Sequence, residues 1–296
     1  MGIELAQALQ VAHEIYAQAD EILGFPLSVL SWYGPEELLN DTINTQPALF
    51  THSIATLRVL QLKFPLLHPL GLAGHSMGEL SALTAAGSLS FADGLRLARI
   101  RGELMKQAGD ISPGGMAAIL GLEIPVVERI CTLAGEHTDI VQVANDNSPG
   151  QVVISGTNTA LERVIPLLHA AGARRVIRLA VSIASHSPLM QHAQRDFSRA
   201  VETTIIHDPV IPIIGNVYAQ PLVSSDAIRQ DLNDQLTNRV RWVESICYLK
   251  TIGVTTYLEI GNGSVLCGLV KRIDPTANVF PCSTLQDLEN LANLII

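Results

Sequence analysis

Apolar side chains recur every three or four residues along residues 1–25, which is the spacing of one face of an amphipathic helix. They are Leu5, Leu9, Ala12, Ile15, Ala19 and Ile22. This pattern predicts that the chain opens in a single helix. A second helical run at residues 47–64 leads into the short apolar segment 70–74, which is typical of a buried parallel strand. A sharp turn and two further helices, at residues 77–89 and 91–106, are expected to follow.

Short β-type segments alternate with helical ones from about residue 114. Strands are expected at residues 116–122, 140–145, 151–155 and 174–180, and helices at residues 124–134 and 158–172. This β-α-β-β-α-β order is that of the split βαβ unit of ferredoxin-like domains. We therefore predict an α/β protein in which a small ferredoxin-like subdomain, residues 114–182, is inserted into a large α/β unit formed by residues 1–113 and 183–296. Further strands of the large unit are expected at residues 211–217 and 255–260.

The composition is that of a chain with a large buried core. Of the 296 residues, 48% are hydrophobic and 16% are charged, and the mean hydropathy is +0.29, which excludes a disordered chain. The formal net charge of −9 argues against a nucleic-acid partner, which requires a cationic surface. Polar residues interrupt every apolar run before it reaches the roughly 20 residues of a membrane helix, so no membrane association is expected.

The four cysteines lie far apart and form no CxxC pair. Neither a disulfide framework nor a zinc site is indicated by this spacing. No pair of histidines has metal-ligand spacing beside a suitable carboxylate, so we infer no metal. A reducing compartment fits best, and we expect a cytoplasmic protein.

The sharpest local signal is Gly74-His75-Ser76-Met77-Gly78, a G-x-S-x-G motif between the apolar strand and the next helix. In that context the motif holds its serine on a tight turn, with the hydroxyl exposed as a nucleophile. The backbone N–H of the next residue, Met77, is then placed to bind an oxyanion. The alternative is a chance glycine turn that opens a helix, and the strand-turn-helix context disfavours it.

A serine hydroxyl becomes a good nucleophile only when a neighbouring base takes its proton, so one of the nine histidines is needed near Ser76. His75 adjoins the serine, but adjacent side chains at a turn usually point apart, which favours a structural or helper role. His186 follows the last strand of the small subdomain, in a loop where the chain re-enters the large unit. It is better placed as the base, although the residues alone leave open a surface or core histidine.

Beyond these local signals, the chain resembles the malonyl-CoA:acyl-carrier-protein transacylases of fatty-acid synthesis and the acyltransferase domains of polyketide synthases. The likeness spans nearly the whole chain, and the motifs follow the family's order. They are TQPAL (45–49), GHSMGEL (74–80), IRG (100–102), NSPGQVVISG (147–156), SHSPLM (185–190), QLTNRVRW (235–242) and EIGNGSVLCGLVKRI (259–273). The resemblance implies a hydrolase-like parallel-sheet core with a ferredoxin-like insertion, in agreement with the pattern above.

The resemblance implies an enzyme that moves a malonyl group from malonyl-CoA to the phosphopantetheine thiol of an acyl carrier protein, with no bound cofactor. Ser76 matches the nucleophile that becomes acylated, and His186 matches its base. Gln235 matches a residue whose backbone carbonyl orients that histidine in relatives. No carboxylate is therefore expected as a third catalytic residue beside Ser76 and His186.

The resemblance also implies a binding site for the acyl group. Arg101 matches the arginine that pairs with the free carboxylate of malonyl, which a planar guanidinium can hold through two parallel hydrogen bonds. Without the resemblance we would expect Arg101 to be a solvated helix charge, like its neighbours Arg96 and Arg99. Gln46 and Asn147 lie in matching motifs near the family's active cleft, without an assigned role.

Docking of the carrier needs a local basic patch, because acyl carrier proteins are acidic and this chain is acidic too. Lys271 and Arg272 are the candidates, against the alternative of a solvated helix end. Asn262 and Ser264 stand where the family usually has proline and lysine, a loop change expected to affect docking more than chemistry.

The start of the chain departs from the family. Relatives begin with a strand and a GQGSQ loop that supplies an oxyanion donor, whereas Met1-Gly2 matches a point shortly after that loop. We therefore expect the chain as written to be poorly active and prone to aggregation.

Three other functions remain open. A methylmalonyl-selective acyltransferase is suggested by the small residues before His186, although malonyl is preferred. A serine hydrolase of the esterase type shares G-x-S-x-G but normally has an acidic residue and then a histidine late in the chain. His186 is instead followed by about a hundred residues rich in family motifs. An inactive, truncated paralogue would keep the fold alone.

Overall fold

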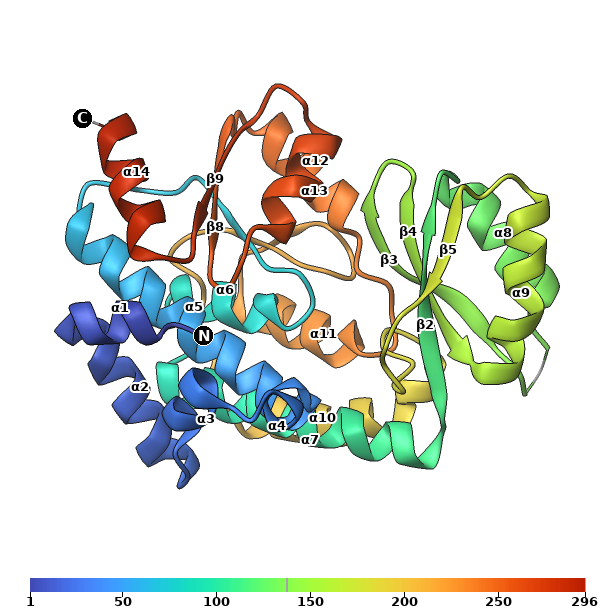
Figure 1. Ribbon diagram of the computed structural model, residues 1–296, viewed down its shortest axis with the longest axis horizontal. Helices are drawn as coiled ribbons and strands as arrows, with labels where there is room; N and C mark the ends of the chain where they lie inside the picture. Colours follow the sequence, from blue (N-terminus) through green and yellow to red (C-terminus); the bar gives the residue numbers. More distant parts are fainter. Residues whose placement is uncertain (137, 296) are drawn as a thin grey trace.

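The computed structural model describes residues 1–136 and 138–295, and it has two units side by side (Figure 1). The large unit contains the first and last parts of the chain, and the small unit is the green and yellow stretch between them. Among the helices of the described residues, none combines the length and the apolar composition needed to cross a membrane.

Five helices open the large unit. They are α1 (Ile3–Ala8), α2 (Gln10–Leu23), α3 (Leu27–Tyr33), α4 (Glu36–Asn40) and α5 (Thr42–Lys63). The prediction of a single helix over residues 1–25 is wrong, because Leu9 is extended, with φ −133° and ψ 116°, and divides α1 from α2. The Leu9 side chain still packs against the core. The apolar spacing therefore continues across the break and could not reveal it.

Short strands form the centre of the large unit. β1 (Leu72–Ala73) pairs in parallel with β6 (Ile213–Ile214), and β7 (Pro221–Leu222) is antiparallel to β6. β8 (Thr256–Ile260) and β9 (Asn278–Cys282) form a second parallel pair. The strands predicted at residues 70–74 and 211–217 are each only two residues long, because the chain leaves the sheet on either side to form turns.

Helices pack around these strands and supply most of the core. α6 (Gly78–Ala85) and α7 (Phe91–Ile111) follow β1, and α7 runs beyond its predicted end at residue 106. The Ser90 side chain caps α7 by accepting a hydrogen bond from the Asp93 N–H at 3.0 Å. The later helical segments are the 3-10 turn Pro188–Met190, α10 (Gln191–Thr203), α11 (Ser225–Gln235), α12 (Trp242–Thr251), α13 (Val265–Ile273) and α14 (Leu285–Ile295).

The small unit has the predicted ferredoxin-like order. It consists of β2 (Gly114–Leu120), α8 (Ile124–Ala134), β3 (Val141–Ser148), β4 (Gln151–Thr157), α9 (Asn158–Ala170) and β5 (Arg175–Arg178). The four strands are antiparallel in the order β3-β4-β2-β5, and they enclose with α8 and α9 a separate hydrophobic cluster. The edge strand β3 faces the large unit, where Val240 pairs with Asn145 (Figure 1). The subdomain boundaries at residues 114 and 182 stay a prediction.

Candidate active site

Ser76 lies on a sharp turn between β1 and α6. Its φ of +53° is in the left-handed region, which a residue with a side chain adopts only under constraint. The turn closes tightly because Gly74 has no side chain: a Cβ there would lie 2.0 Å from the Gly78 carbonyl oxygen. Asn216, just after β6, braces the turn, since its Oδ1 accepts from the Ser76 N–H and its Nδ2 donates to the Gly74 carbonyl, each at 2.7 Å. A constrained turn thus presents the Ser76 hydroxyl to the side chains of His186 and Arg101.

His186 is hydrogen bonded to this serine, with Nε2 2.8 Å from Ser76 Oγ. Its Nδ1 lies 3.0 Å from the Gln235 carbonyl oxygen and 3.1 Å from that of Asn238. Because carbonyl oxygens only accept, we assign the proton to Nδ1, which leaves the Nε2 lone pair facing the hydroxyl. Burial, together with the positive charge of Arg101, lowers the pKa of His186 to about 3. The imidazole is therefore neutral near pH 7 and able to take the serine proton.

The guanidinium of Arg101 reaches the same hydroxyl from α7. Its Nη2 donates to Ser76 Oγ and to Gln235 Oε1, both at 3.0 Å, and its Nη1 donates to Gln46 Oε1 at 2.8 Å. The side chain is only 2% exposed, its Nε–H has no acceptor, and within the described residues it forms no ion pair with a carboxylate. Burial lowers the pKa of Arg101 to about 10, so it stays cationic near pH 7. A buried cation without a carboxylate partner among the described residues has the chemistry to bind an anion.

Two buried carboxyl groups, Glu79 and Asp231, support this arrangement. Glu79 Oε1 and Asp231 Oδ2 accept from the same Asn216 N–H, at 3.1 and 3.2 Å, and Glu79 Oε2 accepts from Gln235 Nε2. Burial, with repulsion from Asp231, raises the pKa of Glu79 well above its ordinary value. The Gln235 amide is therefore held with its nitrogen toward Glu79 and its oxygen toward Arg101, which can only donate.

The backbone N–H of Met77 is the candidate oxyanion donor. Met77 directly follows Ser76 and is the N-cap residue of α6, and within the described part of the chain its N–H donates no hydrogen bond to another protein group. Its position after the nucleophile is the one that supplies an oxyanion donor in such turns. The positive end of the α6 dipole lies at the same place. This N–H is thus available for a developing negative charge.

The small unit contributes Asn147 to the neighbourhood of the serine. Asn147 Oδ1 lies 2.8 Å from His75 Nε2, and the His75 ring packs edge-on against Trp242 with ring centroids 5.5 Å apart. Burial lowers the pKa of His75, which keeps the ring neutral. His75 is therefore held by the boundary between the two units rather than by the serine hydroxyl.

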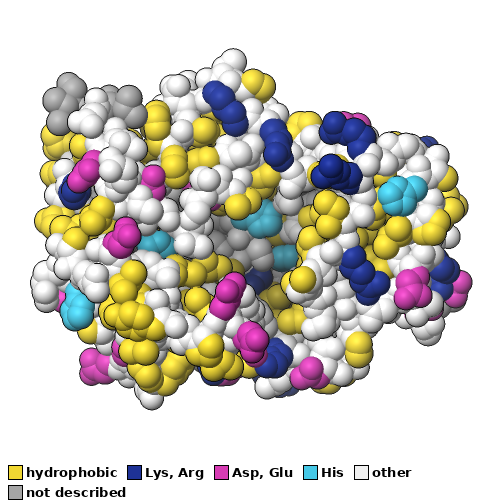
Figure 2. Space-filling model, in the orientation of Figure 1, with side chains coloured by type: hydrophobic (Ala, Val, Ile, Leu, Met, Phe, Trp, Pro, Cys, Tyr) yellow, Lys and Arg dark blue, Asp and Glu magenta, His cyan; other side chains and the backbone are white. Residues whose placement is uncertain are grey.

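Lys271 and Arg272 lie outside this group, exposed in the last turn of α13. Lys271 Nζ donates to the Ala277 carbonyl at 2.8 Å, and Arg272 Nη1 donates to Gln151 Oε1 at the start of β4. Figure 2 shows Lys and Arg side chains gathered above a hollow between the two units, with histidine side chains on the floor of the hollow. The two residues thus belong to the outer surface and not to the serine site.

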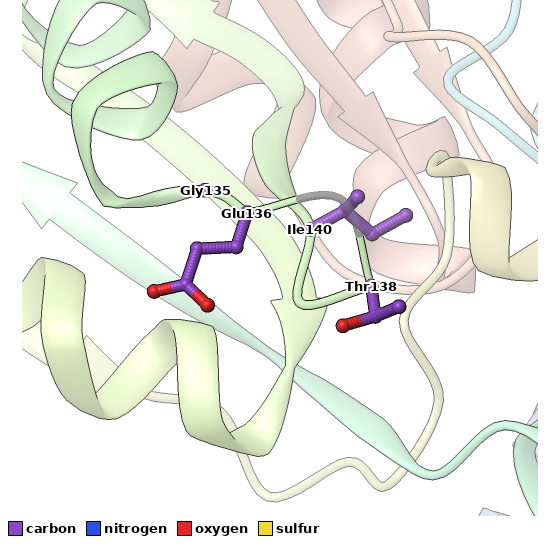
Figure 3. Close-up of a pocket in the computed structure, with 4 residues that line it drawn as sticks. All are labelled: Gly135, Glu136, Thr138 and Ile140. Carbon is purple, nitrogen blue, oxygen red and sulfur yellow. The ribbon is translucent and has the colours of Figure 1, made fainter.

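A second hollow, of about 670 Å³, lies on the small unit at the turn between α8 and β3 (Figure 3). Its lining residues are Gly135, Glu136, Thr138 and Ile140, none of which belongs to the serine site. In residues 1–136 and 138–295, no group of three or more His, Cys, Asp or Glu side chains could hold a metal ion. We assign no role to this hollow.

Asn216 and Glu79 belong to the site but were not predicted from the sequence, although the sequence contains an indication of each. Asn216 follows the apolar run that contains β6, and Ser76 follows the run that contains β1. The carboxyl ends of adjacent parallel strands meet at one edge of a sheet, so these two residues were bound to be neighbours once β1 and β6 were paired. Glu79 is the one charged residue of α6, at the start of the helix, and such a residue is seldom buried without a partner.

Enzymes with a nucleophilic serine commonly align the histidine with a carboxylate. Here two backbone carbonyls take that place, and a guanidinium without a carboxylate partner among the described residues lies beside the hydroxyl that would carry the acyl group. The fold and the geometry of this site are those expected of a serine-dependent acyltransferase of the α/β class.

Comparison with known sequences points to one branch of that class. The model of the acyl transferase domain family matches residues 1–282. The malonyl CoA-acyl carrier protein transacylase of Haemophilus influenzae is 42% identical over 273 residues, which is 92% of this chain and 87% of the relative. The protein of the same name from Bacillus subtilis is 41% identical over 289 residues, 98% of this chain and 90% of the relative.

Solved structures agree with these relatives. The malonyl CoA-acyl carrier protein transacylase of Coxiella burnetii matches with a TM-score of 0.95 at 36% identity, covering 99% of this chain and 92% of that one. A type II PKS acyl-carrier protein in complex with its malonyl-transacylase matches with a TM-score of 0.94 at 41% identity, covering 99% and 94%. The chain therefore belongs to the malonyl-CoA:acyl-carrier-protein transacylase family. The resemblance and the fold class inferred from the sequence are both confirmed.

Proposed function

We propose that this protein transfers a malonyl group from malonyl-CoA to the phosphopantetheine thiol of an acyl carrier protein, in fatty-acid or polyketide synthesis. The observation that carries the proposal is the buried guanidinium of Arg101, 3.0 Å from Ser76 Oγ and without a carboxylate partner among the described residues. Malonyl brings a free carboxylate that can pair with it, and acetyl does not. The names of the relatives support the same substrate.

The first half-reaction forms an ester on Ser76. The serine oxygen attacks the thioester carbonyl of malonyl-CoA while its proton passes to His186 Nε2, and the Met77 N–H stabilises the resulting oxyanion. Collapse of this intermediate breaks the carbon–sulfur bond. The leaving sulfur takes the proton back from the histidine and departs as the free thiol of coenzyme A.

The second half-reaction runs the same steps in reverse with a new thiol. The phosphopantetheine sulfur gives its proton to His186 and attacks the Ser76 ester. The carbon–oxygen bond then breaks, and the serine oxygen recovers its proton from the histidine. The Gln235 and Asn238 carbonyls stabilise the imidazolium that forms in each half, in place of a carboxylate.

Three further parts of the proposal rest on sequence position and surface chemistry. We propose Lys271 and Arg272 as contacts for the acidic carrier, since both are exposed next to the boundary of the two units. Residues 114–182 are proposed as the small subdomain, with its own hydrophobic cluster. A cytoplasmic location is proposed from four cysteines without disulfide spacing.

Incubation with malonyl-CoA labelled in the malonyl group tests the proposal. We expect stable label on the peptide containing Ser76, transfer of that label to added carrier protein, and no label on the variant S76A. Rapid release of label to water would indicate an esterase-type hydrolase instead, and absence of label would indicate an inactive member of the family. Competition with methylmalonyl-CoA decides between the two acyl groups, which differ by one methyl group and so by only about 1–3 kcal/mol in a pocket.

A further inference from the structure

Gln142 connects the small unit to His186, the proposed catalytic base, in the large unit. It lies on β3, the edge strand that faces the large unit (Figure 1). Its side-chain nitrogen donates to the His186 carbonyl at 2.8 Å and to the Thr237 carbonyl at 3.3 Å. An amide nitrogen has two hydrogens, so this geometry uses both.

The two carbonyls belong to the two segments that orient the imidazole. One is the carbonyl of His186 itself, whose φ of +58° is in the left-handed region. The other belongs to Thr237, between Gln235 and Asn238, whose carbonyls receive the Nδ1 proton. The amide of Gln142 therefore ties the backbone of the base to the backbone of the segment that holds its ring.

Backbone contacts align that segment with β3. The Val240 N–H donates to the Ala144 carbonyl at 2.8 Å, and the Val240 carbonyl accepts from the Asp146 N–H at 3.0 Å. These bonds extend the edge of the small sheet by one residue of the large unit. Gln142, two residues before Ala144, is thus held in register with the residues that it contacts.

We infer that Gln142 is a positioning residue for His186, through which the edge strand of the small unit sets the orientation of the catalytic base. The inference rests on the proposed function, because it takes His186 as the base in acylation. It assigns to the inserted unit a part in catalysis in addition to any contact with substrate or carrier. Arg101 is not touched by Gln142, so binding of the malonyl carboxylate should not depend on it.

Three substitutions test the inference. The variant Q142E keeps the shape but places oxygens opposite the two carbonyls, and Q142M keeps the length without a donor. The variant Q142K restores N–H donors at a similar reach. The matched control is Q10E, which alters an exposed glutamine of α2 remote from the site.

We expect Q142E and Q142M to acylate Ser76 about 10- to 100-fold more slowly in single turnover, because small misplacement of a reacting group has effects of this order. The Michaelis constant for malonyl-CoA should change less than about twofold, Q142K should recover much of the rate, and Q10E should match the parent. Nitrogen NMR of labelled histidine should show that His186 loses its single Nδ1–H tautomer in Q142E and Q142M but not in Q10E. A role in folding alone would leave that tautomer unchanged in the folded variants.

Parent rates together with an unchanged His186 tautomer in Q142M would overturn the inference. So would a raised Michaelis constant with an unchanged rate constant. If Q142E does not fold, Q142M and Q142K decide the question. If the parent protein is not acylated by malonyl-CoA, the proposed function fails, and the NMR measurement still reports whether Gln142 orients His186.

Discussion

At the scale of single residues, the environment of Arg101 distinguishes it from other cations of the same helix. Arg96 is exposed and paired with Asp93, whereas Arg101 is buried against the side-chain oxygens of Gln46 and Gln235. Two amide oxygens and the Ser76 hydroxyl accept from the guanidinium, but neutral groups do not offset its charge, and within the described residues its Nε–H has no acceptor. We propose that the carboxylate of an incoming malonyl group offsets this charge.

The variant R101A should therefore lose malonyl transfer more than acetyl transfer. We expect acylation by malonyl-CoA to fall about 10- to 100-fold, in line with the loss of hydrogen bonds to a charged group, while acetyl-CoA improves relative to it. Initial rates with both thioesters measure the ratio. R96A, on the exposed face of the same helix, is the control, and an equal fall of both rates in R101A would assign this residue a structural role only.

The pKa of His186 leads to a prediction on pH. An ordinary histidine is half protonated near pH 6.5, and a protonated base cannot accept the serine proton. Because burial and Arg101 lower the pKa to about 3, the base stays neutral as the pH falls through 6.5. We expect kcat/KM for acylation by malonyl-CoA to be nearly flat from pH 8 to pH 5. A decline with a midpoint near 6.5 in short single-turnover reactions would show that the ring is hydrated in solution.

At the scale of elements, the turn from β1 to α6 depends on one of its two glycines more than on the other. A Cβ at Gly74 would lie 2.0 Å from the carbonyl oxygen of Gly78, whereas a Cβ at Gly78 has no atom within 4 Å. The first glycine lets the end of the strand contact the start of the helix. The second imposes no such requirement on the fold.

Replacement of each glycine by alanine should separate these roles. We expect G74A to lower the free energy of unfolding by about 1–3 kcal/mol or more, because the turn must open to admit the methyl group. G78A should leave it unchanged or raise it by up to about 1 kcal/mol, since alanine favours a helix. Denaturant unfolding of both variants is the measurement, and equal stability of the two would contradict the packing described for this turn.

At the scale of the whole molecule, the negative net charge of the chain repels an acidic partner. The chain carries a net charge of −9, so an acidic carrier is repelled at long range and must be held by a local cationic surface. Lys271 and Arg272 are exposed on α13 of the large unit. Arg272 also donates a hydrogen bond to Gln151 of the small unit, so both residues lie at the boundary between the units. A carrier bound there would therefore contact both units.

The double variant K271E/R272E should weaken the carrier step alone. We expect the Michaelis constant for the carrier to rise several-fold, and more at low salt, while acylation by malonyl-CoA stays unchanged. The double variant R58E/K63E, which alters two exposed cations of α5 and changes the net charge equally, is the control. A similar rise in both double variants would mean that total charge acts rather than this surface.

Features that depend on neighbouring residues and on the order of motifs could be predicted from the amino-acid sequence. Apolar spacing located the strands and helices of the small unit, and the G-x-S-x-G context located the constrained serine turn. The series of motifs identified the family, which the comparisons confirm. Each of these signals lies within a few residues of chain, where the backbone geometry of one element governs the pattern.

The contacts between residues far apart in the chain became known from the packing of the elements. Ser76 and His186 are 110 positions apart, and Arg101 and Gln235 are 134 apart. Hydrophobic periodicity carries no information at such separations, because contacts across them depend on how whole elements pack. The same limit hid the break at Leu9, which keeps its side chain in the core, and the role of Gln142, which exists only because the edge of the small sheet lies against the loop of the base.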